Sequence, residues 1–261
     1  MDRRRPNPPR GARPRLVALH GGGTDHRLWA PVRDRLSARF DLVTPDLPGH
    51  GGEPAPAEAT VEGMAAALAP RLRGVVEGEP YLLLGHSLGA MVAMALASTD
   101  LPPPRRLILA DPFLRPSTGL DRSARMLALQ WGARVLGPRQ AARVGVERTG
   151  LAALPPGDPL RASMEHAHAW PMHVMLRALR RFDGRRHLAR VACPTLLLMA
   201  GGNPATDGEG ERMARHLARA RIEIMPRVGH LQMRDDPAGF AAAVLRFAAE
   251  DEAAWEDLDP G

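Results

Sequence analysis

A serine between two glycines stands at residues 85–89, which have the sequence Gly-His-Ser-Leu-Gly. An apolar stretch over residues 81–84 precedes this pentapeptide, and small apolar residues over 90–97 follow it. A buried strand that turns sharply into a helix strains its central residue, and only glycine at the two outer positions lets the neighbouring chain come close enough. The pattern predicts that Ser87 is a nucleophile at the head of a helix, where backbone N–H groups favour negative charge.

A glycine-rich loop, His-Gly-Gly-Gly at residues 20–23, follows a short apolar run over residues 15–19. Nucleophilic attack on a carbonyl builds up an oxyanion that needs two preorganised N–H donors. We expect these donors to be the N–H of Leu88, directly after the serine, and the N–H of Gly22. A phosphate-binding loop is disfavoured, because neither the Gly-x-x-x-x-Gly-Lys nor the Gly-x-Gly-x-x-Gly spacing is present.

A candidate general base, His230, ends the segment Val-Gly-His at residues 228–230. It lies between the last predicted strand and the last predicted helix, so its loop belongs to the edge of the sheet where Ser87 is expected. A general base must reach the serine hydroxyl from that edge. The position of His230, and the order serine before histidine, predict that it takes the proton from Ser87.

A second group of polar residues, Glu165, His166, His168 and His173, raises the question of a metal site. Two histidines at positions i and i+2 point to different sides of a helix, which is poor spacing for metal ligands. We therefore expect no metal, and we expect this segment to contact the substrate instead.

Strand-like and helix-like segments alternate along most of the chain. Apolar runs predict six strands, at residues 15–19, 41–44, 81–84, 107–110, 195–199 and 221–225. Helical spacing predicts helices over residues 28–40, 61–76, 90–97, 208–219 and 237–249. This alternation is typical of βαβ crossovers, and strands without polar alternation are typical of parallel sheets buried on both faces. The predicted fold class is α/β, with a mostly parallel central sheet flanked by helices.

The alternation stops after the fourth predicted strand, where residues 113–188 contain helix-like segments and no good strand. We interpret them as a helical cap inserted over the carboxyl edge of the sheet, where ligands bind in such folds. The core is then residues 15–112 and 189–250. Residues 1–14 are expected to be a flexible Arg- and Pro-rich arm, and residues 251–261 an acidic tail.

The composition narrows the set of partners. The formal net charge is +6, and every basic residue is arginine, scattered along the chain without an aromatic stripe, so no nucleic-acid partner is expected. A single cysteine, Cys193, excludes an intramolecular disulfide and agrees with a reducing compartment.

Prolines follow the basic N-terminal residues at positions where a signal peptide would be apolar. No apolar run approaches the ~18 residues of a membrane span. We expect a cytoplasmic protein with a small-molecule acyl substrate and no membrane partner; the oligomeric state stays open.

Taken together, these segments resemble the α/β-hydrolase family, and within it the lactonase, esterase and C–C-bond hydrolase group. The matching pieces, in chain order, are residues 19–22, 46–51, 85–89, 193–198 and 229–230. The resemblance covers about residues 15–110 and 190–249. It implies an eight-stranded sheet, a helical cap over the site and a Ser–His–acid triad without a cofactor.

The chain departs from the family pattern in two places. The family usually opens with a β-hairpin, but only the Arg- and Pro-rich arm precedes Arg15, so we expect this hairpin to be absent. The family most often places an aspartate shortly after the fifth strand, where this chain has Asn203. An asparagine orients a histidine but stabilises imidazolium poorly.

Two aspartates are alternatives for the acid. Asp111 follows the fourth predicted strand directly, and Asp207 stands four residues beyond Asn203. We favour Asp111, because a strand end holds catalytic geometry better than a loop does. Asp207 is also suited to cap the helix that follows it, so Asp111, Asp207 and Asn203 all remain candidates.

The predicted activity follows from these positions. Ser87, His230 and Asp111 would cleave a carboxylic ester or lactone through an acyl-enzyme, with Gly22 and Leu88 holding the oxyanion. Three related reactions on the same frame, hydrolysis of a thioester, an amide or a C–C bond, are alternatives. A fourth alternative is a non-catalytic ligand-binding homologue, which the uncharged Asn203 keeps open.

Overall fold

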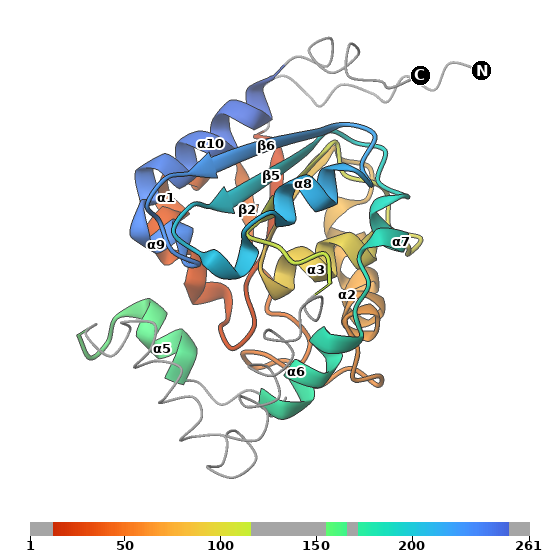
Figure 1. The fold of residues 1–261 in the computed structure, drawn as a ribbon. Coiled ribbons are helices and arrows are strands. Elements are labelled where there is room, and N and C mark those ends of the chain that lie inside the picture. The colour runs from red at the N-terminus through yellow and green to blue at the C-terminus, as the bar shows by residue number, and fades with distance from the viewer. Residues whose placement is uncertain (1–12, 116–154, 166–171, 251–261) are drawn as a thin grey trace.

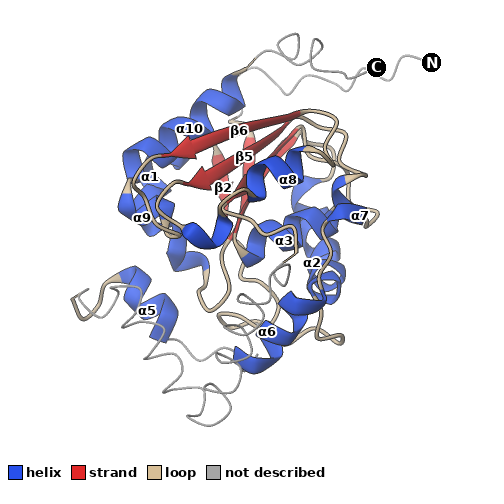
Figure 2. Cartoon of the chain, in the orientation of Figure 1, coloured by secondary structure: helices blue, strands red, loops and turns tan. Residues whose placement is uncertain are grey.

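The computed structural model describes residues 13–115, 155–165 and 172–250. Within them the chain forms a six-stranded sheet, all parallel, in the order β2-β1-β3-β4-β5-β6. Figures 1 and 2 show this sheet with helices around it. The strands are β1 (Arg15–Leu19), β2 (Asp41–Val43), β3 (Tyr81–His86), β4 (Arg106–Ala110), β5 (Thr195–Ala200) and β6 (Ala220–Met225). All six predicted strands are confirmed, with ends that differ by at most two residues, and the predicted α/β class is confirmed with them.

Burial explains why these segments are strands of a parallel sheet. Every residue of β3, β4 and β5 is buried, so both faces of each strand are covered. The register pairs Leu19 with Gly85, His86 with Ala110, and Ala110 with Leu198. The carboxyl ends of β1, β3, β4 and β5 therefore meet at one edge of the sheet, and the loops that leave this edge are neighbours.

Helices cover the sheet on both faces (Figure 1). One layer packs on the side of Leu16 and Leu84 and contains η1 (His26–Val32), α1 (Arg33–Ser37), α9 (Gln232–Asp235) and α10 (Pro237–Ala249). The opposite layer packs on the side of Val17 and Leu83 and contains α2 (Val61–Val76), α3 (Leu88–Leu96) and α8 (Glu209–Ala214). No helix among the described residues combines the length and the apolar character that crossing a bilayer requires.

Three predicted helices differ from the structure. Residues 28–40 were expected to form one helix, but they divide into the 3-10 helix η1 and the short α1. Pro31 lies inside η1, and its missing N–H removes a hydrogen bond that a continuous α-helix would need. The helix predicted over 208–219 ends at Ala214, and α3 begins at Leu88, directly after the serine.

Between β4 and β5 the described elements are all helices: α5 (Pro159–Glu165), α6 (Met172–Arg181) and α7 (Arg185–Leu188). The N–H of Gly184 donates to the carbonyl oxygen of Leu114 at 2.9 Å, and the N–H of Leu114 donates to the buried Glu209 of α8 at 2.9 Å. The chain thus leaves and rejoins the body of the protein at one place, as an inserted cap would.

Several predictions fall outside the described residues. They concern the arm and the absent hairpin (residues 1–12), much of the cap (116–154 and 166–171, with His166 and His168) and the tail (251–261). The domain boundaries therefore stay predictions.

Candidate active site

Ser87 occupies a strained turn between β3 and α3, with a φ of 52°. Its N–H donates to the carbonyl oxygen of Ala110 at 3.0 Å. A Cβ on Gly85 would lie 2.5 Å from the carbonyl oxygen of Gly89, and a Cβ on Gly89 would lie 2.3 Å from that of Leu19. Neither position has room for a side chain, so the two glycines permit the close crossing that holds Ser87 in its left-handed conformation.

His230 lies in the loop between β6 and α9 and faces Ser87. Its Nε2 is 2.9 Å from the Ser87 Oγ, and its Nδ1 is 2.5 Å from the Asp111 Oδ2. In the tautomer that satisfies both contacts, Nδ1–H donates to the carboxylate and Nε2 accepts the serine hydroxyl. The structure therefore brings Ser87, His230 and Asp111, three residues predicted as catalytic, into one hydrogen-bonded row.

Asp111 follows β4 directly, with a φ of 47°, and its side chain is fully buried. Its Oδ1 accepts the Thr206 hydroxyl at 2.7 Å and the Ala200 N–H at 3.2 Å. Burial by itself would raise the pKa of Asp111, but the hydrogen bonds from His230, Thr206 and Asn203 outweigh it and hold this pKa below its usual value. Asp111 is consequently an ionised carboxylate at neutral pH.

The two alternatives to Asp111 have different surroundings. The Asn203 Nδ2 donates to the Asp111 Oδ2 at 2.6 Å and lies 3.3 Å from the His230 Nδ1. Asp207 is exposed, and among the described contacts its carboxylate has none with His230. It does not cap α8 either, because the residue at that N-cap is Gly208.

Two residues that sequence reasoning missed also belong to the site. Thr206 supports Asp111, and nothing in its sequence context indicated this contact. His86 is buried, and its Nε2–H donates to the carbonyl oxygen of His230 at 2.8 Å. Burial and the neighbouring His230 lower the pKa of His86 to about 3, so His86 is neutral and supports the His230 loop. Its place inside the serine pentapeptide was the signal that could have identified it.

The residues predicted to hold an oxyanion are neighbours. Leu88 opens α3, so its N–H is among the first-turn amides that have no acceptor within the helix. A Cβ on Gly22 would lie 3.3 Å from the Leu88 Cδ2 and 2.7 Å from the Met175 Sδ of α6. The glycine loop therefore runs beside the head of α3, and a methionine from the segment between β4 and β5 covers it.

A second row of serine, histidine and carboxylate connects the turn after α3 with α7 and α2. The Ser98 Oγ is 2.7 Å from the His187 Nδ1, and the His187 Nε2 is 3.2 Å from the Glu62 Oε1. The hydrogen bond from His187 lowers the pKa of Glu62 to about 2, with help from Arg186. Ser98 is an ordinary helix-end residue without strained backbone, so this row fastens three helices and offers no activated nucleophile.

One cluster of possible metal ligands occurs among the described residues: Asp25, His26 and Asp46, whose ligand atoms lie within 4.8 Å of one another. Asp25 is paired with Arg27 at 2.8 Å, and the His26 Nδ1 is 3.0 Å from an Asp46 oxygen. A metal ion would have to displace Arg27, so the cluster does not fit one. In the group considered from the sequence, Glu165 instead pairs with Arg161 at 2.7 Å.

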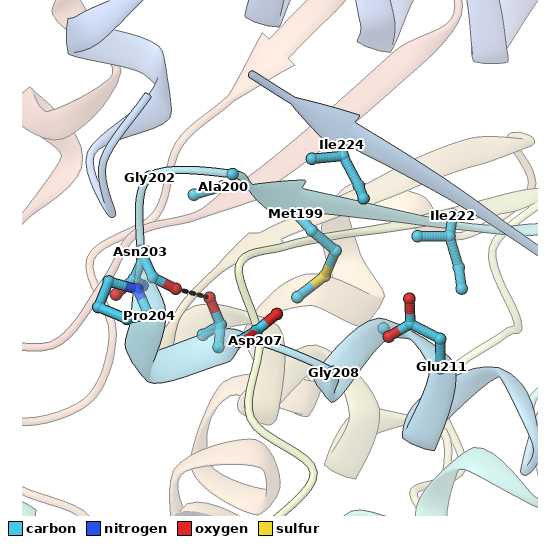
Figure 3. A pocket seen from close by; sticks show the side chains of 13 residues that line it. Met199, Ala200, Gly202, Asn203, Pro204, Asp207, Gly208, Glu211, Ile222 and Ile224 are labelled. Carbon is cyan, nitrogen blue, oxygen red and sulfur yellow. Dashed lines mark hydrogen bonds between the residues drawn. The ribbon is translucent and has the colours of Figure 1, made fainter. Parts of the chain in front are cut away.

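A cavity of about 300 Å³ lies behind this site, between the ends of β5 and β6 and α8 (Figure 3). Asn203, Thr206 and Asp207 line it on one side, and Ile222 and Ile224 line it on the other. Neither Ser87 nor His230 lines it. This cavity is therefore not a substrate pocket for the serine.

Comparisons with known proteins agree with this geometry. The model of the alpha/beta hydrolase family matches residues 16–243. A pimeloyl-(acyl-carrier protein) methyl ester esterase from Nitrosomonas europaea is 30% identical over 257 residues, which cover 89% of this chain and 94% of that relative. An N-formylmaleamate deformylase from Pseudomonas putida is 28% identical over 237 residues, covering 89% and 87% of the two chains. A solved esterase from Thermogutta terrifontis has a TM-score of 0.75 and 25% identity over 91% of this chain and 90% of its own.

The crowding at the serine turn leads to a stability prediction. Gly89→Ala places a Cβ against two backbone carbonyls, at 2.3 and 2.4 Å, so we expect it to destabilise the protein by more than ~2 kcal/mol. Gly74→Ala is the matched control, because nothing lies within 4 Å of its Cβ. Within α2 that change is expected to stabilise the protein by ~1 kcal/mol. Urea unfolding measures both, and equal stability of the two variants would contradict the steric argument.

Proposed function

Since this chain belongs to the alpha/beta hydrolase family, we propose that it is a serine hydrolase that cleaves a carboxylic ester or lactone through an acyl-enzyme. The observation that supports this most directly is the row in which Ser87, His230 and Asp111 are joined by contacts of 2.9 and 2.5 Å. The strained backbone of Ser87 adds support, because such strain persists only where the surrounding structure maintains it.

The first half of the reaction acylates the serine. The Ser87 hydroxyl gives its proton to the His230 Nε2, and the Oγ attacks the carbonyl carbon of the ester. The N–H groups of Leu88 and Gly22 hold the oxygen that becomes negative. The tetrahedral intermediate collapses when the imidazolium of His230 protonates the leaving alcohol, and Ser87 is left as an ester of the acyl group.

The second half releases the acid. His230 removes a proton from water, the hydroxide adds to the acyl carbonyl, and the proton returns to the Ser87 Oγ as the carboxylic acid leaves. Asp111 stays ionised throughout and stabilises the positive charge on His230. Its lowered pKa is what this role needs, because a protonated aspartic acid could not stabilise imidazolium.

The substrate side of the site is formed partly by the segment between β4 and β5, which we propose is a cap. Met175 of α6 lies over Gly22, and the Phe113 ring centroid is 6.4 Å from that of His230. These apolar groups favour a substrate with an apolar acyl chain. The Nitrosomonas europaea relative is a methyl ester esterase, so methyl esters of medium-length acids are the first substrates to test. The cytoplasmic location stays a prediction of the sequence.

A second candidate reaction is amide hydrolysis, because one relative is an N-formylmaleamate deformylase. The same row of residues would serve it, with an amine as the leaving group in place of an alcohol. A panel of methyl esters, lactones, thioesters and N-formyl amides separates these reactions by their kcat/KM values.

The role of Ser87 and its partners can be tested by labelling and turnover. We expect a fluorophosphonate probe to modify Ser87 promptly, because the adjacent imidazole activates the hydroxyl. Ser87→Ala should abolish labelling, and Asp111→Asn should lower kcat for a methyl ester by about 10⁴-fold. Mass spectrometry locates the label. An unmodified Ser87 together with no turnover of any ester would favour the non-catalytic alternative.

The cap residue Met175 leads to a prediction about substrate size. Met175→Ala removes the side chain that lies over Gly22, so kcat/KM for long acyl chains should rise several-fold relative to short ones. Met213→Ala is the control, since Met213 is also buried but lies on α8 instead of α6. An unchanged ratio of long-chain to short-chain turnover in Met175→Ala would show that Met175 does not limit the acyl group.

A further inference from the structure

The carboxylate of Asp111 is held by donors from two loops, the one after β5 and the one after β6. His230 comes from the loop after β6, while Asn203, Thr206 and the N–H of Ala200 come from the end of β5 and the turn that follows. Both oxygens are thereby occupied: Oδ1 by Thr206 and Ala200, and Oδ2 by Asn203 and His230. This leaves the carboxylate one orientation, in which Oδ2 points to the imidazole.

The amide of Asn203 has only one arrangement that satisfies its neighbours. Its Oδ1 accepts the Ala205 N–H at 3.2 Å and caps the 3-10 helix η3 (Pro204–Thr206). Its Nδ2 must therefore face Asp111, and it lies 2.6 Å from the Asp111 Oδ2 and 3.3 Å from the His230 Nδ1. Figure 3 shows Asn203 on this loop, beside Pro204. The amide occupies the angle between the carboxylate and the imidazole and donates to the same oxygen as His230.

An aspartate at position 203 would have the same shape as Asn203, but it would repel the Asp111 carboxylate instead of donating to it. β4 and β5 are neighbours in the sheet, so a carboxylate at position 203 would also be within reach of the His230 Nδ1. It would place a second negative oxygen about 2.6 Å from the first. Two carboxylates this close cannot both be ionised at neutral pH, and the amide avoids the conflict by supplying a donor.

We propose that Asn203 is a positioning residue that aims the Asp111 carboxylate at His230 and occupies the place of a second acid. This inference rests on the proposed function, because aiming matters only if His230 acts on Ser87. In this chain the carboxylate stands after β4 and the amide stands after β5. If the two groups are exchanged, His230 should still have one ionised partner.

The first test removes the hydrogen bond from position 203 to Asp111 but keeps the side-chain cap on η3. Serine is a good N-cap residue, so Asn203→Ser preserves η3 but does not reach Asp111. We expect kcat for a methyl ester to fall about tenfold, with KM and the melting temperature little changed. Full activity in Asn203→Ser would show that Asn203 serves only as a cap and would overturn the proposal.

The second test exchanges the two groups. Asp111→Asn alone should lose about 10⁴-fold in kcat, and adding Asn203→Asp to it should restore at least tenfold of that loss. In the double variant one new carboxylate oxygen still caps Ala205, and the other takes the place of Nδ2 beside His230. No recovery in a folded double variant would overturn the proposal, because position 203 would then be unable to serve the imidazole.

An NMR measurement, which needs no turnover, tests the role of Asn203 independently of the proposed function. The hydrogen-bonded Nδ1 proton of His230 should give a far-downfield NMR signal in the wild-type chain and in the double variant, and no such signal in Asp111→Asn. If wild type leaves esters and the fluorophosphonate untouched, the proposed function fails, while return of this signal in the double variant still supports the role of Asn203. If wild type is active and the signal does not return, only the role of Asn203 fails.

Discussion

A negative charge kept at a fully buried position is the constraint on which this site depends. The Asp111 carboxylate has no exposed surface, and without partners a carboxyl group there would take up a proton. Its hydrogen bonds come from His230, Asn203, Thr206 and the Ala200 N–H. These partners lie on the loops after β5 and β6, and Asp111 itself follows β4. Holding one charge therefore fixes the relative positions of three strand ends.

Ser87 and Asp111 are connected through the backbone as well. The N–H of Ser87 donates to the carbonyl oxygen of Ala110, the residue directly before Asp111. Ser87 and Asp111 both have positive φ values, 52° and 47°, in a region that residues with side chains rarely adopt. The two strained residues stand at the ends of adjacent strands, and a hydrogen bond joins Ser87 to the residue before Asp111. These strained backbone conformations let both side chains point toward the same imidazole.

The core and the segment between β4 and β5 contribute different residues to this site. The core supplies Ser87, His230 and Asp111, from loops and turns at one edge of the sheet, and the head of α3. The inserted segment supplies Met175, which lies over Gly22, and it joins the core through the pair Leu114 and Gly184. Under the proposed function, substrate contacts on this segment can change without altering the row at the sheet edge, and the two relatives are named for different substrates.

The sequence alone determined the features that depend on local spacing. Apolar runs identified all six strands, and the glycines at 85 and 89 identified the turn that presents Ser87, because these patterns follow from contacts within a few residues. The sequence left Asp111, Asp207 and Asn203 as candidates for one role, since each follows a strand end and local spacing carries no distance between loops. Only the tertiary structure placed Asp111 beside His230, turned the Asn203 amide toward both, and left Asp207 exposed. Thr206 and His86 emerged there too, because their partners lie 95 and 144 residues away along the chain.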